Sequence, residues 1–220
     1  GFSFEYLKAL VYESYKEKGA DLELNYKELV FNYRSNDDII KFSNLVQALR
    51  GVLFNDKVAF QTKWLDNYNS YNSLLYFDKN IDLQENDIEQ NYKFIFPTIK
   101  DNQFFKEDGL LNVLEMELHD TPLEVKGLEY DLIVLYRFGD FYLKELENLS
   151  TKIENGFQDK ESSLSYEYFF NNFYVAITRA KERILVIDSP EAKDRFWKYI
   201  DVDLLYNRYK LNFKVDNIDK

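Results

Sequence analysis

Two stretches of the chain are apolar at nearly every position, and they predict buried strands. They are residues 132–136 and residues 183–188, the latter with an unbroken apolar run at 184–187. Because strands that are covered on both faces carry continuous apolar runs, both stretches are typical of a parallel sheet between helical layers. Shorter apolar runs predict further strands at residues 27–31, 72–77 and 92–97.

Apolar residues recur at steps of three and four outside these strands, which predicts helices. One of them can be capped by Ser35 or Asn36, and its first turn holds Asp37 and Asp38, the charge that a helix N-terminus favours. Gly51 suits its end. Helices are expected at residues 4–18, from residue 36 to Gly51, at 142–149, at 166–180 and at 189–200.

The remaining segments are less regular. Residues 150–164 are polar and predict a surface loop, whereas Ser189 followed by Pro190 predicts a helix start. Residues 110–118 fit either a strand or a helix end. We expect one domain over residues 1–200, followed by an extension or linker at 201–220.

Strands that alternate with helices indicate an α/β fold of three layers with a mainly parallel sheet. In such folds ligands bind beside the carboxyl ends of the strands. Polar residues next to strand ends are therefore the first candidates for a functional site.

The composition excludes several kinds of functional site. The 220 residues include no Cys and a single His, His119, which excludes disulfides, a thiol nucleophile and sites rich in Cys or His. Lys and Arg number 28 against 39 Asp and Glu, a formal net charge of −11. Taken alone, this acidity argues against a nucleic-acid surface.

Three polar segments flank predicted strands, and each has an ordinary interpretation. Arg34 can be a surface ion-pair partner, Lys126-Gly127 an ordinary turn, and Arg179 a cation that complements a helix C-terminus. The segments are Asn32-Tyr33-Arg34-Ser35, Lys126-Gly127-Leu128-Glu129-Tyr130-Asp131 and Tyr174-Val175-Ala176-Ile177-Thr178-Arg179-Ala180.

In this order the three segments resemble motifs IV, V and VI of the UvrD/Rep-like superfamily 1 helicases, in their second (C-terminal) RecA-like motor domain. Residues 1–7 look like the stretch after motif III of that family. The resemblance implies a three-layer RecA-like domain of the P-loop NTPase type, without a phosphate loop of its own. It also implies that the full-length protein is an ATP-dependent DNA helicase or translocase.

The resemblance assigns a role to each matched residue. Arg179 would be the arginine finger and Arg34 a second ligand of the γ-phosphate, since a guanidinium stays protonated and donates two parallel hydrogen bonds. Tyr33 would stack on adenine, and Glu129 would accept hydrogen bonds from the ribose. Gly127 would let the backbone turn close to the nucleotide.

DNA contacts carried over from the family fall on Asn44, Thr121 and Lys126. The match is looser here, because Leu123 stands where the family usually has His. The partners implied are single-stranded DNA and a first RecA-like domain. The cofactors implied are ATP and Mg²⁺, with Mg²⁺ held mainly by that first domain.

The sequence contains no phosphate loop before Arg34, so the chain alone is expected to hold half of an ATP site and to be inactive. It also shows no signal sequence or apolar run of membrane-spanning length, and a cytoplasmic location is expected. The net charge of −11 predicts weak DNA binding by this half alone. Two alternatives stay open: a helicase-derived nucleotide- or protein-interaction module without ATP turnover, and an unrelated α/β binding domain.

Overall fold

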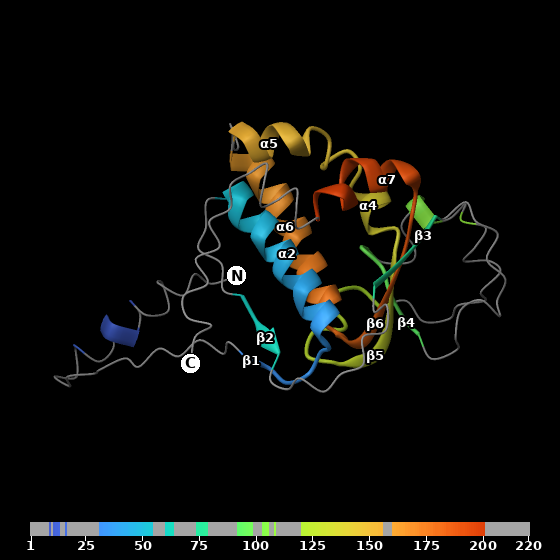
Figure 1. Cartoon of the computed structure of the whole chain (residues 1–220). Helices are drawn as coiled ribbons and strands as arrows, with labels where there is room; N and C mark the ends of the chain where they lie inside the picture. The colour runs from blue at the N-terminus through green and yellow to red at the C-terminus, as the bar shows by residue number, and fades with distance from the viewer. Residues whose placement is uncertain are drawn as a thin grey trace.

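Parallel strands and the helices beside them form an α/β domain, as predicted (Figure 1). The computed structural model describes residues 9, 11–13, 16, 31–54, 60–63, 74–78, 92–98, 103–105, 108, 120–155 and 160–200. Four strands lie side by side, all parallel, in the order β3 (Leu74–Asp78), β6 (Ala180–Asp188), β5 (Tyr130–Tyr136) and β4 (Lys93–Ile95). A separate parallel pair consists of β1 (Phe31–Asn32) and β2 (Thr62–Lys63).

Both faces of the sheet are buried at its central strands β5 and β6, which confirms the interpretation of their apolar runs. Successive residues of β5 point to opposite faces, so Ile133 and Leu135 enter one hydrophobic cluster while Val134 and Tyr136 enter another. The first cluster includes residues of the long helices α2 (Asp37–Phe54) and α6 (Lys160–Ile177). The second contains several aromatic rings, among them Phe105 from the short helix η2 (Gln103–Phe105).

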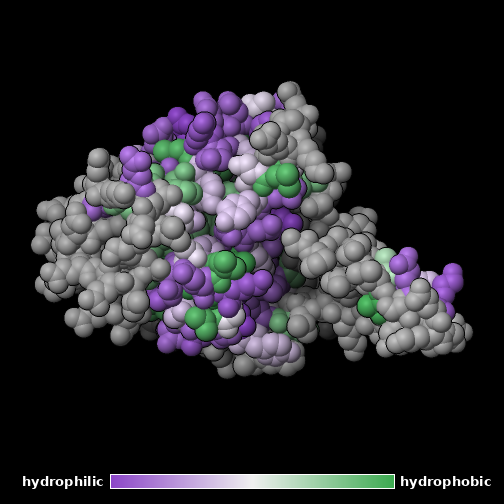
Figure 2. Space-filling model, turned by 180° about the vertical axis from the view of Figure 1, so that it is seen from behind, coloured by the Kyte–Doolittle hydropathy of each residue, from purple (hydrophilic) through white to green (hydrophobic). Residues whose placement is uncertain are grey.

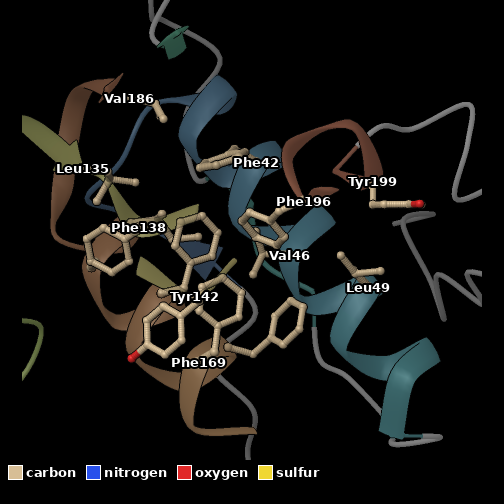
Figure 3. Packing of buried hydrophobic residues seen from close by; sticks show 14 of the residues in the cluster. Phe42, Val46, Leu49, Leu135, Phe138, Tyr142, Phe169, Val186, Phe196 and Tyr199 are labelled. Carbon is tan, nitrogen blue, oxygen red and sulfur yellow. The ribbon is translucent and has the colours of Figure 1, made fainter. Parts of the chain in front are cut away.

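The helices α2 and α6 run alongside each other next to the sheet (Figure 1). Phe173 of α6 packs edge-on against Phe42 of α2, with ring centroids 6.2 Å apart. Phe196 lies against Phe169 and Phe173 at 4.9 and 5.2 Å, so rings from distant segments share one core (Figure 3). Such aromatic pairs add to the gain from burial of their apolar area.

Asn36 caps α2, and it is one of the two residues, Ser35 and Asn36, that the sequence offered as the cap. Its side-chain oxygen accepts a hydrogen bond from Ile39 N at 3.1 Å, and Asp37 pairs with Lys41 at 2.5 Å within the first turns. The predicted end at Gly51 is wrong, because α2 continues to Phe54 and buries Leu53. Burial of that side chain outweighs the weak helix propensity of one glycine.

The predicted loop at 150–164 is wrong in part. Helix α5 (Leu149–Asn155) and the first turns of α6 lie there, and residues 142–148, expected to be helical, form turns. Leu149 and Ile153 are the buried positions of α5, so two apolar residues hold an otherwise polar helix in place. The predictions for residues 1–8, 10, 14–15, 17–18, 27–30, 72–73, 110–119, 156–159 and 201–220 lie outside the described residues.

The predicted helix after Ser189 is shorter than expected: α7 (Pro190–Arg195) is followed by the 3₁₀ helix η3 (Trp197–Tyr199). The Ser189 hydroxyl accepts a hydrogen bond from Ala192 N at 3.1 Å and caps α7, which begins at Pro190 and so confirms the predicted helix start. Helix α7 packs against α4 (Phe138–Phe141), which directly follows β5.

Gly139 makes the close approach of α4 to α7 possible. A Cβ at this position would lie 2.7 Å from Ala192 Cβ and 2.8 Å from Asp188 Oδ2. We therefore expect Gly139→Ala to lower the free energy of unfolding by about 1–3 kcal/mol, the usual cost of overpacking. Thermal denaturation followed by circular dichroism measures it, and Lys144→Ala, at an exposed position in the next turn, is the control. An unchanged midpoint for Gly139→Ala would contradict the close packing of α4 on α7.

The surface of the described part is largely polar on the face shown in Figure 2, where hydrophobic residues form small separate groups. No helix in the described part is both long enough and apolar enough to cross a membrane.

Candidate functional site

The residues of the three motif-like segments gather at the amino ends of β5 and β6. Glu129 directly precedes β5 and Arg179 directly precedes β6, and Tyr130 N donates a hydrogen bond to Arg179 O at 2.9 Å. Arg34 reaches the same place from the turn after β1. The expectation that candidates would lie at carboxyl ends therefore holds for Arg34 and is wrong for the other two.

The turn between β1 and α2 is shaped by Asn32. Its side-chain oxygen accepts hydrogen bonds from Arg34 N at 2.8 Å and Ser35 N at 2.9 Å, an Asx turn. The Ser35 hydroxyl then donates to Ala180 O at 2.7 Å, and Asn36 N donates to Lys181 O at 2.9 Å. The turn is thus fastened to the first residues of β6, which fixes Arg34 next to β5 and β6.

Arg34 and Glu129 form an ion pair that links the first segment to the second. Arg34 Nε lies 2.5 Å from Glu129 Oε1, and the two side chains are 40% and 41% exposed. A pair with this much contact with water contributes little to stability. Both charged groups are therefore accessible to a ligand from solution.

Arg179 is half-buried and turns back onto the end of its own helix. Its Nε donates to Val175 O at 3.0 Å, and its two terminal nitrogens donate to Leu128 O at 3.2 Å and Thr178 Oγ1 at 3.1 Å. This is the ordinary role of a cation at a helix C-terminus that the sequence allowed. Burial and the positive charge of Arg34 lower the pKa of Arg179, and Glu129 opposes that effect.

Arg34, Glu129 and Arg179, here called the amino-edge cluster, combine two guanidinium groups with one carboxylate. The pKa of Arg179 is lowered because burial partly removes its charge from water and because Arg34 places a second positive charge nearby. An anionic ligand would relieve this repulsion. The arrangement is suited to binding a phosphate group through Arg34 and Arg179.

Tyr33 and Gly127 flank the amino-edge cluster in sequence. Tyr33, one position before Arg34, is 67% exposed. Gly127 has φ of +89°, a conformation that a residue with a side chain rarely adopts, while a Cβ there would meet nothing within 4 Å. The backbone angle alone thus explains glycine at this position.

The three residues predicted to contact DNA differ in their surroundings. Asn44 forms two hydrogen bonds with the backbone of Gln61, at 2.7 and 2.9 Å, and so ties α2 to the segment of β2. Thr121 N and Oγ1 both donate to Glu124 Oε2, at 2.7 and 2.9 Å, and close the turn before β5. Lys126 is exposed on that turn. Hydrogen bonds within the protein are enough to explain why Asn44 and Thr121 stand at these positions. The DNA contacts of all three residues stay predictions.

A second polar cluster lies at the carboxyl ends of β5 and β6, and sequence reasoning missed it. Asp188, the last residue of β6, is fully buried and accepts hydrogen bonds from Gly139 N at 2.7 Å, Asp140 N at 2.9 Å and Trp197 Nε1 at 2.9 Å. Burial, followed by the charge of Asp140, raises the pKa of Asp188 to about 7. The only signal in the sequence is a single Asp at the end of an apolar strand, which by itself looks like a strand terminus.

Arg137 completes this carboxyl-edge network. Its guanidinium donates to Asp108 at 2.6 Å and to Asp140 at 3.2 Å, and stacks over the ring of Phe104 at 4.2 Å. The Ser189 hydroxyl donates to Asp140. Since the charged groups of this network are bonded to one another, the network holds β5, α4, β6 and α7 together.

A shallow pocket of about 400 Å³ lies beside the network. It is lined by Phe104, Arg137, Asp140, Leu143, Ser189, Pro190 and Glu191.

Across the described residues, no group of three or more His, Cys, Asp or Glu side chains could hold a metal ion. In comparisons with known proteins, the chain matches no protein-family model and no curated protein sequence.

Proposed function

We propose that this chain is the second, RecA-like motor domain of an ATP-dependent DNA helicase or translocase similar to the UvrD/Rep-like superfamily 1 enzymes. One observation carries the proposal. Arg34, Glu129 and Arg179, which stand far apart in the sequence within three motif-like segments, meet at one edge of a parallel sheet. The parallel pairing of β5 with β6 by itself places Glu129 and Arg179 at the same edge, but a chance resemblance gives no reason for Arg34, from the turn after β1, to reach that edge and pair with Glu129.

The chemistry of ATP hydrolysis accounts for the composition of the amino-edge cluster. Charge spreads over the γ-phosphate oxygens in the transition state, and Arg34 and Arg179 supply the compensating positive charge. Glu129 is an acceptor for ribose hydroxyls, and the exposed ring of Tyr33 offers a face for adenine. These residues form one side of a site whose phosphate loop and Mg²⁺ ligands belong to a first motor domain.

Movement on DNA follows from a site divided between two domains. ATP bound between them favours the closed arrangement, and hydrolysis releases it, so the two domains alternate their hold on single-stranded DNA. The DNA contacts of this chain are proposed at the exposed Lys126 and at Asn44 and Thr121, whose side chains also form internal hydrogen bonds.

Hydrolysis of ATP by the full-length protein, with and without single-stranded DNA, tests the proposal. We expect DNA to stimulate hydrolysis, and Arg34→Ala to lower kcat/KM by about 10- to 100-fold, the value of one or two charged hydrogen bonds to phosphate. Arg195→Ala is the matched control, because Arg195 is also 40% exposed and ion-paired but lies in α7. Absence of ATP hydrolysis in the wild type would instead favour the interaction module without turnover.

A further inference from the structure

The ion pair between Arg34 and Glu129 places a competitor for phosphate inside the proposed phosphate site. Glu129 Oε1 lies 2.5 Å from Arg34 Nε, so the carboxylate is in direct contact with the guanidinium. An anion that takes the same face of Arg34 has to displace this carboxylate. Displacing the carboxylate costs little free energy, because the Arg34 and Glu129 side chains are 40% and 41% exposed. Every anion that binds to this face of Arg34 meets the same cost.

What happens to the displaced carboxylate differs between ligands. Leu128 O and Val175 O already accept hydrogen bonds from Arg179, so that guanidinium is engaged with carbonyl groups. The displaced Glu129 carboxylate, 41% exposed, then takes its hydrogen-bond donors from water or from the ligand. A sugar with two adjacent hydroxyl groups supplies them, whereas inorganic polyphosphate has none and adds negative charge beside the carboxylate.

We propose that Glu129 determines ligand specificity by guarding Arg34, that is, by occupying its guanidinium when no ligand is bound. The carboxylate repels inorganic phosphates. It is displaced by a ligand that joins a polyphosphate to a hydroxylated sugar, a nucleoside triphosphate. This inference rests on the proposed function, since it assumes that Arg34 and Arg179 bind phosphate. It adds that the resting ion pair selects against phosphate chains without a sugar.

Binding of three ligands by the chain, measured by NMR titration without Mg²⁺, tests the inference. The ligands are ATP, 2′,3′-dideoxy-ATP and inorganic tripolyphosphate, and the variants are Glu129→Gln and Glu182→Gln. Glu182 is the matched control, because it is exposed near the start of β6 and its change alters the net charge equally.

In the wild type we expect dideoxy-ATP to bind about tenfold more weakly than ATP, as befits lost hydrogen bonds to a charged acceptor. In Glu129→Gln we expect tripolyphosphate to bind about two- to fivefold more tightly than in the wild type. The advantage of ATP over dideoxy-ATP should shrink in the same variant. Glu182→Gln should change tripolyphosphate binding less than Glu129→Gln does.

Equal tripolyphosphate affinity in the two glutamine variants would overturn the inference. Equal affinity of the wild type for ATP and dideoxy-ATP would overturn it without any variant. Arg34→Ala separates this failure from failure of the proposed function. If that change weakens ATP binding while Glu129→Gln has no effect, only the guarding role fails; if it leaves ATP binding intact, the phosphate site itself is wrong.

Discussion

Arg179→Ala in the full-length protein is expected to lower kcat for DNA-stimulated ATP hydrolysis by about 10³-fold or more, the usual contribution of an arginine finger. The KM for ATP should change by only a few-fold, because the charge that Arg179 compensates develops in the transition state. Burial and the positive charge of Arg34 lower the pKa of Arg179, and Arg179 still carries its charge. A guanidinium short of counter-charge gains more from a developing phosphate charge than one that is already paired.

The hydrogen bonds of Arg179 to Val175 O and Leu128 O provide a competing explanation that the experiment has to separate. If Arg179 only secures the end of α6, its loss lowers stability by about 1–2 kcal/mol and leaves kcat of the folded protein unchanged. Arg179→Lys keeps the charge but loses the planar fork, and should recover only a small part of kcat. The control is again Arg195→Ala, and wild-type kcat in Arg179→Ala at a temperature where it is folded would refute the finger role.

The strands of the main sheet could be predicted because their apolar runs leave no alternative. Residues 133–136 pair in register with residues 184–187 in the centre of the sheet, where both faces are covered and every paired position is apolar. Strand β2 could not be predicted, since it has two residues and depends on Asn44 and Asn32 bonding to Gln61. Its position follows from tertiary contacts that no local pattern carries.

Helix boundaries were the weaker part of the prediction, and the reason is burial. Lys160 to Ser165 are mostly polar and look like a loop, yet they continue the helix whose later turns bury Phe169, Phe170 and Phe173. Cooperative extension from a well-packed segment carries polar turns along with it. The apolar periodicity of the sequence marks only those turns of the helix that pack against the core.

The candidate site was predicted residue by residue, but its side of the sheet was not. Glu129 and Arg179 precede their strands in the sequence, so in a parallel sheet they must share its amino edge. The general rule of ligands at carboxyl ends favoured the opposite edge. That opposite edge holds the network around Asp188, where the buried charges are bonded internally.

Asp188→Ala is expected to lower the free energy of unfolding by about 3 kcal/mol or more, because it leaves three buried donors without an acceptor. The donors are Gly139 N, Asp140 N and Trp197 Nε1, which connect β6 to α4 and η3. Asp194→Ala, at an exposed position in α7, is the control and should change stability by less than about 0.5 kcal/mol. Chemical denaturation measures both, and equal stabilities of the two variants would contradict the role of Asp188.

The pH dependence of stability supplies an independent readout of the same carboxylate. The native protein keeps the Asp188 proton up to about pH 7, whereas the unfolded chain releases it near the ordinary pKa of 3.8. Between these values the unfolded state binds fewer protons, so this group makes stability fall as pH rises, by up to about 1.4 kcal/mol per pH unit. Asp188→Asn removes the titration while it keeps the shape. The difference in stability between wild type and Asp188→Asn should therefore decrease from pH 4 to pH 7 and stay constant above it, and a difference independent of pH would show that Asp188 is charged throughout this range in the folded protein.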